Sequence, residues 1–138
     1  EIHLHGGTTE QSLPTGTYTK LTGFEHNGLS KNCTPNFTAG THTFVQAGRY
    51  RVDGSVSFES NTNNVVFKLA PFLDGVEQDN VHFQRKVSTS GDVGAAGLSG
   101  FIEVTAGQVL DLRASHDNVG TVGFTPTYMN FNVQYIGA

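Results

Sequence analysis

Cysteine and positive charge are scarce in this chain, and each shortage limits how the protein can be stabilised or what it can bind. The single cysteine, Cys33, cannot form an intramolecular disulfide, so packing or assembly must stabilise the fold. Only 8 of the 138 residues are Lys or Arg, and apart from Arg85 and Lys86 they are scattered singly. No basic stripe exists to neutralise phosphates, which argues against nucleic acid as a partner.

Long apolar runs are also missing. None approaches the ~18 residues that span a membrane, so no membrane insertion is expected. The chain instead has 17 glycines and 10 phenylalanines, with only 14% charged residues. Helices are richer in Ala, Glu, Lys and Leu, whereas this composition favours short strands joined by turns. With 138 residues, the sequence predicts one all-β domain with one core.

The clearest strand pattern runs from Tyr50 to Glu59, where apolar and polar residues alternate. A period of two is typical of a strand with one buried face. The predicted core residues are Tyr50, Val56, Phe58, Leu112, Phe131 and Val133. Further strands are predicted over residues 18–24, 37–46, 65–73, 81–87, 96–104, 109–115 and 128–136. About eight to ten strands of similar length favour a two-sheet antiparallel sandwich.

Residues 1–17 differ from the rest of the chain, since they are polar, rich in Gly and Thr and without periodicity. This predicts an N-terminal arm ahead of a sandwich domain over residues 18–138. An extended arm can lie along a neighbouring subunit and add backbone hydrogen bonds. The predicted attachment residues are Ile2, His3, Leu4 and His5.

Four short motifs give the chain a more specific likeness. They are Gly48-Arg49-Tyr50, Phe72-Leu73-Asp74-Gly75, the run from Val104 to Leu112, and the terminal Tyr135-Ile136-Gly137. In this order they resemble the tumour-necrosis-factor-like jelly roll that is shared with the complement globular heads, over roughly residues 37–137. Gly48 and Gly107 would permit the tight turns of these motifs. The resemblance implies a jelly-roll sandwich that assembles as a homotrimer.

Two departures from the animal heads point to a different branch of the family. Those heads usually end in a Phe-Xaa-Gly-Xaa-Leu strand, whereas residues 131–137 read Phe-Asn-Val-Gln-Tyr-Ile-Gly, and Gln108 stands where an acidic residue is expected. Such an ending looks more like the knob domains on bacteriophage fibres and capsids. The resemblance therefore implies a structural virion protein on the particle surface, as a capsid decoration, head fibre or fibre tip, in contact with other virion proteins.

A homotrimer requires a buried contact, and the strand phase suggests where it lies. Phe72 and Phe101 fall on the phase opposite to the core set of their strands, so each is predicted to face outward. Tyr128 is a third candidate for the same contact. A stray surface phenylalanine or a face covered by a loop is the alternative explanation.

Catalytic patterns are absent from the sequence. The stretch Gly97-Leu98-Ser99-Gly100 lacks the Gly-Xaa-Ser-Xaa-Gly form and precedes a strand rather than a helix. His116 and Asp117 are adjacent, but neighbouring side chains on an extended chain point apart. The protein is therefore predicted not to be an enzyme.

His3-Leu4-His5 is the motif whose spacing could place metal ligands together. On an extended strand both imidazoles project from one face, and three copies around a trimer axis would supply six nitrogens to an octahedral transition metal. Phage fibres use such His-Xaa-His pairs on their axes, so the resemblance implies a metal at His3 and His5. The alternative is a solvated pair with no cofactor. The acidic turn at Asp74, Glu77 and Asp79 lacks the spacing of a calcium loop.

The main alternative to a virion scaffold is a head that binds a receptor or a cell-surface glycan. It would be either a phage adhesin or a secreted, extracellular lectin of the complement type. Polar loop residues would then carry the binding. The candidates are Asn61, Asn63, Asn64, His116 and Asn118.

Overall fold

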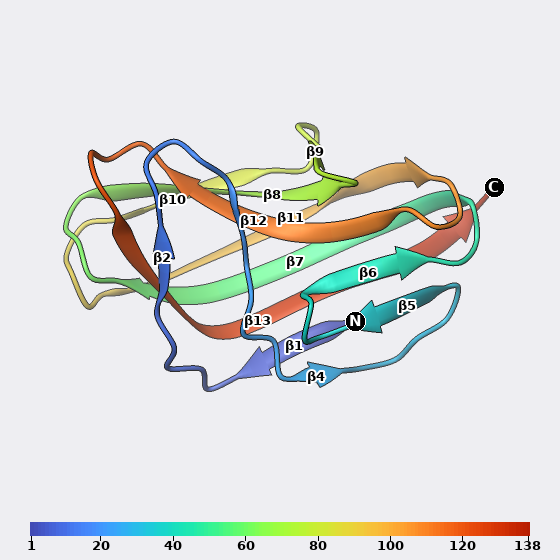
Figure 1. Ribbon diagram of the computed structural model, residues 1–138, viewed down its shortest axis with the longest axis horizontal. Coiled ribbons are helices and arrows are strands. Elements are labelled where there is room, and N and C mark those ends of the chain that lie inside the picture. The colour runs from blue at the N-terminus through green and yellow to red at the C-terminus, as the bar shows by residue number, and fades with distance from the viewer.

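The computed structural model describes residues 1–138 as an all-β structure with two antiparallel sheets (Figure 1). Its strands are β1 (Ile2–His5), β2 (Gln11–Leu13), β3 (Thr19–Lys20), β4 (His26–Asn27), β5 (Cys33–Asn36), β6 (Thr41–Phe44), β7 (Gly48–Ser60), β8 (Val65–Leu73), β9 (Val76–Glu77), β10 (Phe83–Val87), β11 (Val93–Val104), β12 (Val109–His116) and β13 (Val122–Gly137). The chain has no helix that is long and apolar enough to cross a membrane.

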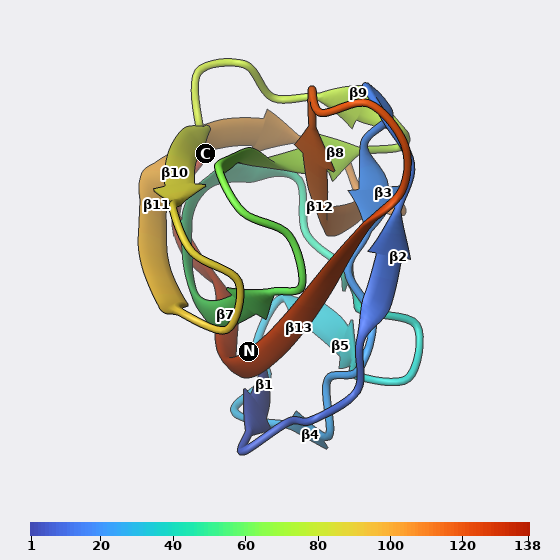
Figure 2. The ribbon, with the colours of Figure 1, turned by 90° about the vertical axis from the view of Figure 1, so that its left-hand side faces the viewer.

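The two sheets face each other as a sandwich. Sheet A has the order β11-β7-β13-β1-β4, with β2 pairing with the start of β13. Sheet B has the order β10-β8-β12-β6-β5, with β3 beside β12 and β9 beside β8. The end view in Figure 2 shows the two layers around the interior that the core side chains fill. Each sheet buries one face and turns the other outward.

Strand β7 organises sheet A because both of its edges are paired over most of its length. Strand β11 pairs with one edge and β13 with the other. Tyr50, Val52, Val56 and Phe58 point inward and are buried, while the polar residues between them point outward. The predicted strand from Tyr50 to Glu59 is therefore confirmed.

An aromatic cluster fills the centre of the core. The Phe58 ring stacks on Phe124 with centroids 4.5 Å apart and meets Phe67 edge-on at 5.1 Å. Such pairs add to the stabilisation that comes from burying apolar area. Five of the predicted core residues are buried, namely Tyr50, Val56, Phe58, Leu112 and Phe131, and Val133 is partly buried against the core.

The long predicted strands are confirmed, and the errors concern strand ends and short strands. Strand β11 begins at Val93 and β13 at Val122, each earlier than predicted. Within the predicted strand 18–24, only Thr19–Lys20 is paired. The predicted turns over residues 25–36 contain β4 and β5, whose two and four residues are too few to show a period.

The prediction of a free N-terminal arm over residues 1–17 is wrong. Strand β1 pairs with β13, with Ile2 opposite Phe131, and the two strands lie side by side in Figure 1. Ile2 and Leu13 are fully buried, and Leu4 is 5% exposed. Only two alternate apolar positions mark β1, which is too short a pattern to detect. An attachment role for this strand loses its premise, because half of its side chains lie inside the sandwich.

Replacing Leu4 by Ala is expected to lower the free energy of unfolding by about 2 kcal/mol, the low end for a large-to-small core truncation. The low end applies because β1 is a short strand of four residues. Urea denaturation followed by fluorescence measures the change. The exposed His5→Ala on the same strand should change stability by less than ~0.5 kcal/mol. Equal stability of Leu4→Ala and the wild type would mean that β1 does not pack on the core.

Candidate functional site

Two rows of outward side chains cross the middle of sheet A. By strand pairing, one row is Gly97, Ser55, Asn130 and His3, and the next is Ala95, Ser57, Tyr128 and His5. We call these rows, with the neighbouring outward residues of β7, β11 and β13, the sheet A outer face. Neither row contains Asp, Glu, Lys or Arg. These two uncharged rows are easier to dehydrate than the flanking rows, which carry Asp53 and Glu59, as the centre of a protein interface requires.

The three predicted interface residues do not share one surface. Phe101 is 60% exposed and Tyr128 is 49% exposed, both on the sheet A outer face. Phe72 lies on sheet B and is only 8% exposed. The Tyr18 ring at 5.0 Å and the Arg113 guanidinium at 4.4 Å from its centroid cover it. The prediction that Phe72 is free for a partner is therefore wrong, because a segment of the same chain lies over it.

Strand β1 places the predicted metal pair on the sheet A outer face. His3 and His5 are alternate residues and project to the same side. Pairing of β1 with β4 brings the His26 ring to 5.3 Å from that of His3, and His5 meets Tyr128 edge-on at 5.1 Å. No group of three or more His, Cys, Asp or Glu side chains is placed to hold a metal. A metal at this pair would need ligands from other copies and stays a prediction.

The predicted glycan-binding asparagines shape the loops that carry them. The Asn61 side-chain oxygen accepts a hydrogen bond from the Gly123 backbone N–H at 2.9 Å. The Asn63 side-chain oxygen accepts one from the Ser90 N–H at 2.6 Å. Asn64 has a φ of 56°, in the left-handed region that Asn tolerates in turns. These bonds and this turn give the three residues structural roles.

His116 is fully buried, so the prediction that it contacts a glycan is wrong. Its Nε2 donates to the Leu13 carbonyl at 2.7 Å, and its Nδ1 accepts from the Asn118 N–H at 3.2 Å. Asp117 is exposed, and its carboxylate pairs with Lys68 instead. The adjacent His116 and Asp117 therefore form no catalytic dyad.

A polar groove of about 580 Å³ crosses the outer face of sheet B. Its floor is a row across β10, β8 and β12, made of Gln84, Lys68 and Ser115. The segment ahead of β3 and strand β9 form its walls, and the Tyr18 hydroxyl from the first lies close to the Glu77 carboxylate from the second. Sequence reasoning missed this groove because strand register and two short strands, which leave no periodic signal, bring its residues together.

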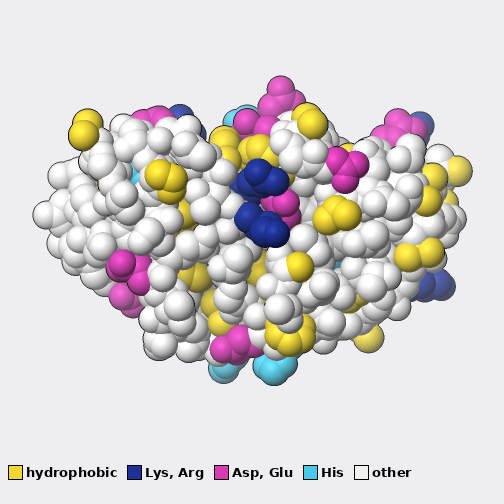
Figure 3. Space-filling model, viewed as in Figure 1, with side chains coloured by type: hydrophobic (Ala, Val, Ile, Leu, Met, Phe, Trp, Pro, Cys, Tyr) yellow, Lys and Arg dark blue, Asp and Glu magenta, His cyan; other side chains and the backbone are white.

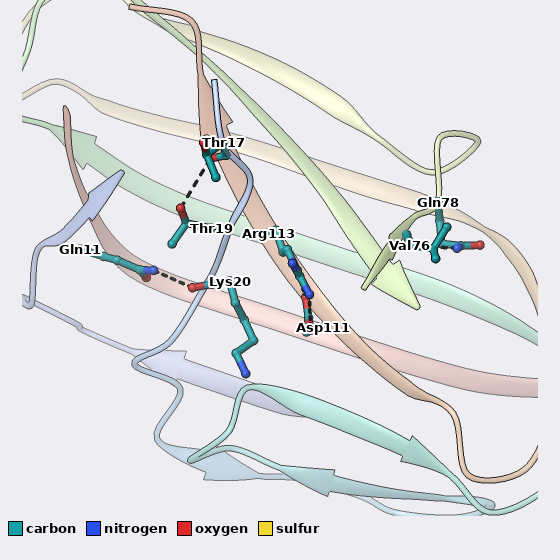
Figure 4. A network of polar contacts seen from close by, with 8 residues as sticks. All are labelled: Gln11, Thr17, Thr19, Lys20, Val76, Gln78, Asp111 and Arg113. Carbon is teal, nitrogen blue, oxygen red and sulfur yellow. Dashed lines mark hydrogen bonds and ion pairs between the residues drawn. The ribbon is translucent and has the colours of Figure 1, made fainter. Parts of the chain in front are cut away.

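Both walls of the groove are held by hydrogen bonds. Beside Tyr18, the Thr19 hydroxyl donates to the Thr17 carbonyl at 3.5 Å, and the Gln11 amide donates to the Lys20 carbonyl at 2.6 Å (Figure 4). On the other wall, the Gln78 N–H donates to a β8 carbonyl at 3.0 Å. The groove is therefore shaped before any ligand arrives.

Two ion pairs lie in and beside the groove, and the Glu77 carboxylate has no cationic partner. Figure 3 shows a basic group with an acidic side chain at the middle of this side of the molecule, and separate charged side chains, mostly acidic, nearer its edges. Arg113 Nε lies 2.6 Å from Asp111 Oδ1, with Lys20 close by in Figure 4. Inside the groove, Lys68 Nζ lies 2.6 Å from an Asp117 oxygen. The ion pairs cancel most of the charge on this face, and a small net negative charge is left in the groove.

Tyr18 stays neutral over the whole physiological range. Burial raises the pKa of its hydroxyl to about 12, and the nearby Glu77 carboxylate adds to the increase. A neutral phenol both donates and accepts hydrogen bonds. The wall that carries Tyr18 therefore offers an aromatic ring and a polar edge at one point.

A scan against protein-family models and a search of curated proteins give no match to this chain. A function has therefore to be inferred from the strand pairing and from the two outer surfaces.

Proposed function

We propose that this chain is a non-enzymatic, trimeric jelly-roll knob displayed on the surface of a bacteriophage particle. The observation that carries the proposal is the pairing of its eight main strands, which are β1, β6, β7, β8, β10, β11, β12 and β13. Numbered in chain order, the first pairs with the eighth, the second with the seventh, the third with the sixth and the fourth with the fifth. Such nesting arises when one long hairpin rolls up, which is the arrangement of a jelly roll.

The sheet A outer face supports a trimer. Its middle rows are uncharged and contain the exposed Tyr128 ring, while the exposed Phe101 lies opposite Arg51, beyond the row that carries Asp53. On this face Asn132 Oδ1 is buried without a hydrogen-bond partner, and His3 Nδ1 has only the Glu1 carboxylate nearby, at 3.7 Å. Burial of this face between copies would remove apolar area from water at about 25 cal/mol per Å².

The proposal predicts a mass of three times the 14.8 kDa chain in sedimentation or light scattering at micromolar concentration. Tyr128→Glu would place a charge in the middle of the contact and is expected to give a monomer, because an unpaired buried charge is costly. Val119→Glu adds the same charge at a fully exposed position and should remain trimeric. A monomeric wild-type protein would overturn the trimer.

The virion role has a separate test. An antibody against the chain should label purified phage particles at regular surface positions in electron microscopy. If the antibody labelled only host or animal cell surfaces and no particles, the virion role would be contradicted and a secreted head favoured.

A further inference from the structure

We infer that the groove on the outer face of sheet B binds a short, uncharged oligosaccharide. The groove lies on the sheet opposite to the proposed trimer face, so it stays open whether or not the chain assembles. Its volume of about 580 Å³ falls in the range of small-molecule sites. Because the groove is open in a monomer and in an assembly alike, the inference does not rest on the proposed virion role.

The polar groups of the groove match the chemistry of sugar hydroxyls. Each hydroxyl of a sugar donates one hydrogen bond and accepts others. The groove supplies acceptors in the carboxylates of Glu77 and Asp117, a donor in the Lys68 ammonium, and both in the Gln84 amide. A mixture of donors and acceptors favours a ligand whose neighbouring groups can do either.

The apolar groups of the groove match the other half of a sugar. A pyranose ring presents a face of C–H groups, which is removed from water when it lies against an aromatic ring. Tyr18 is partly exposed on one wall and presents such a ring, whereas Phe83 lies opposite Leu69 and packs mainly against the core. His82 adds a second ring, held by a hydrogen bond between its Nδ1 and the Asp79 carbonyl.

Charge in the groove selects against anionic ligands. Two carboxylates, Glu77 and Asp117, stand against one ammonium, Lys68, which is already paired with Asp117 at 2.6 Å. A phosphate, sulfate or sialic acid would meet a net negative site and would have to break this ion pair. A neutral sugar can form hydrogen bonds with these charged groups without breaking the ion pair.

The first test is a labelled preparation of the wild-type protein on an array of neutral and anionic oligosaccharides of two to six sugars. We expect binding to neutral members, with sialylated and sulfated members bound more weakly. Titration calorimetry with the best free neutral oligosaccharide then measures the affinity per chain. No binding to any neutral member, or a preference for anionic ones, would overturn the inference.

Two variants test whether the sugar binds in the groove. Glu77→Gln keeps the size of the side chain but removes a charged acceptor, and Tyr18→Ala removes the ring. Each is expected to weaken binding by about 10-fold or more. The matched control is Glu25→Gln, an exposed carboxylate outside the groove, which should bind as the wild type does. Thermal melting checks that each variant is folded, since Tyr18 also covers Phe72.

The two proposals fail separately. Tyr128→Glu alters the sheet A outer face and should keep the wild-type affinity per chain in calorimetry even where it is monomeric. Wild-type affinity in both Glu77→Gln and Tyr18→Ala would place the sugar elsewhere and overturn the inference. Loss of affinity in the folded Tyr128→Glu would also overturn it, because the site would then lie on sheet A.

Discussion

Phe58→Ala is expected to lower the free energy of unfolding by about 4 kcal/mol and the melting temperature by roughly 15 °C. Phe58 is fully buried and contacts Phe124 and Phe67 at ring centroid distances of 4.5 and 5.1 Å. Its removal loses the burial of the ring and leaves a cavity that rings from both sheets line. Rigid walls on both sides oppose collapse of the cavity, so the cost lies high in the usual range.

Chemical denaturation and calorimetric melting together measure the Phe58→Ala effect. Val119→Ala is the matched control, because Val119 is fully exposed and its truncation should change stability by less than ~0.5 kcal/mol. A melting temperature for Phe58→Ala within a degree or two of the wild type would show that the phase of β7 is wrong.

The protein is expected to lose about 3 kcal/mol of stability between pH 6.5 and pH 4 because of one residue, His42. Its side chain is fully buried, and burial lowers its pKa from 6.5 to about 4. Nε2 donates to the Phe131 carbonyl at 2.9 Å, so Nδ1 carries the lone pair, and Nδ1 is buried with no partner. A proton on Nδ1 would be buried without an acceptor.

The sign of this effect follows from which state binds the proton. Below pH 6.5 His42 is protonated in the unfolded chain but not in the folded chain, so the free energy of unfolding decreases as the pH is lowered. The loss levels off below about pH 4, where the folded state also takes the proton. Above pH 6.5 both states are neutral at this residue, and its contribution does not vary with pH.

Denaturation curves from pH 3.5 to 8 in the wild type and in His42→Leu test this prediction. The variant should lack most of the loss between pH 6.5 and 4, although it also leaves the Phe131 carbonyl without its donor and is less stable at pH 7. The exposed His5→Leu should retain the wild-type loss. An unchanged pH dependence in His42→Leu would assign the acid sensitivity to other groups.

The long strands could be predicted because each shows its own alternation. Strand β7 has thirteen residues with inward Tyr50, Val56 and Phe58, so its phase is unmistakable in the sequence. The two-residue strands β3, β4 and β9 show no period, and their pairing is set by the tertiary structure. The same limit explains the error over residues 1–17, where β1 depends on its pairing with β13.

The candidate surfaces were predicted in part for the same reason. The inward and outward alternation along each strand was enough to place Phe101 outward and to put His3 and His5 on one face. Phase could not show that Tyr18 covers Phe72, because that contact joins segments far apart in the sequence. The groove depends on such contacts, so the sequence could single out Glu77 and Asp117 locally but could not show that they lie together.

The position of β13 in sheet A has a consequence for the rate and order of folding. β13 lies between β7 and β1 and is the last of the strands along the chain, so sheet A cannot close until residues 122–137 have been synthesised. Pairings this distant in sequence make sandwiches fold slowly, in milliseconds to seconds. Until then the long edge of β7 that β13 covers is free to pair with another chain. Low expression levels or dilution should therefore favour soluble protein, and premature termination ahead of β13 should yield aggregates.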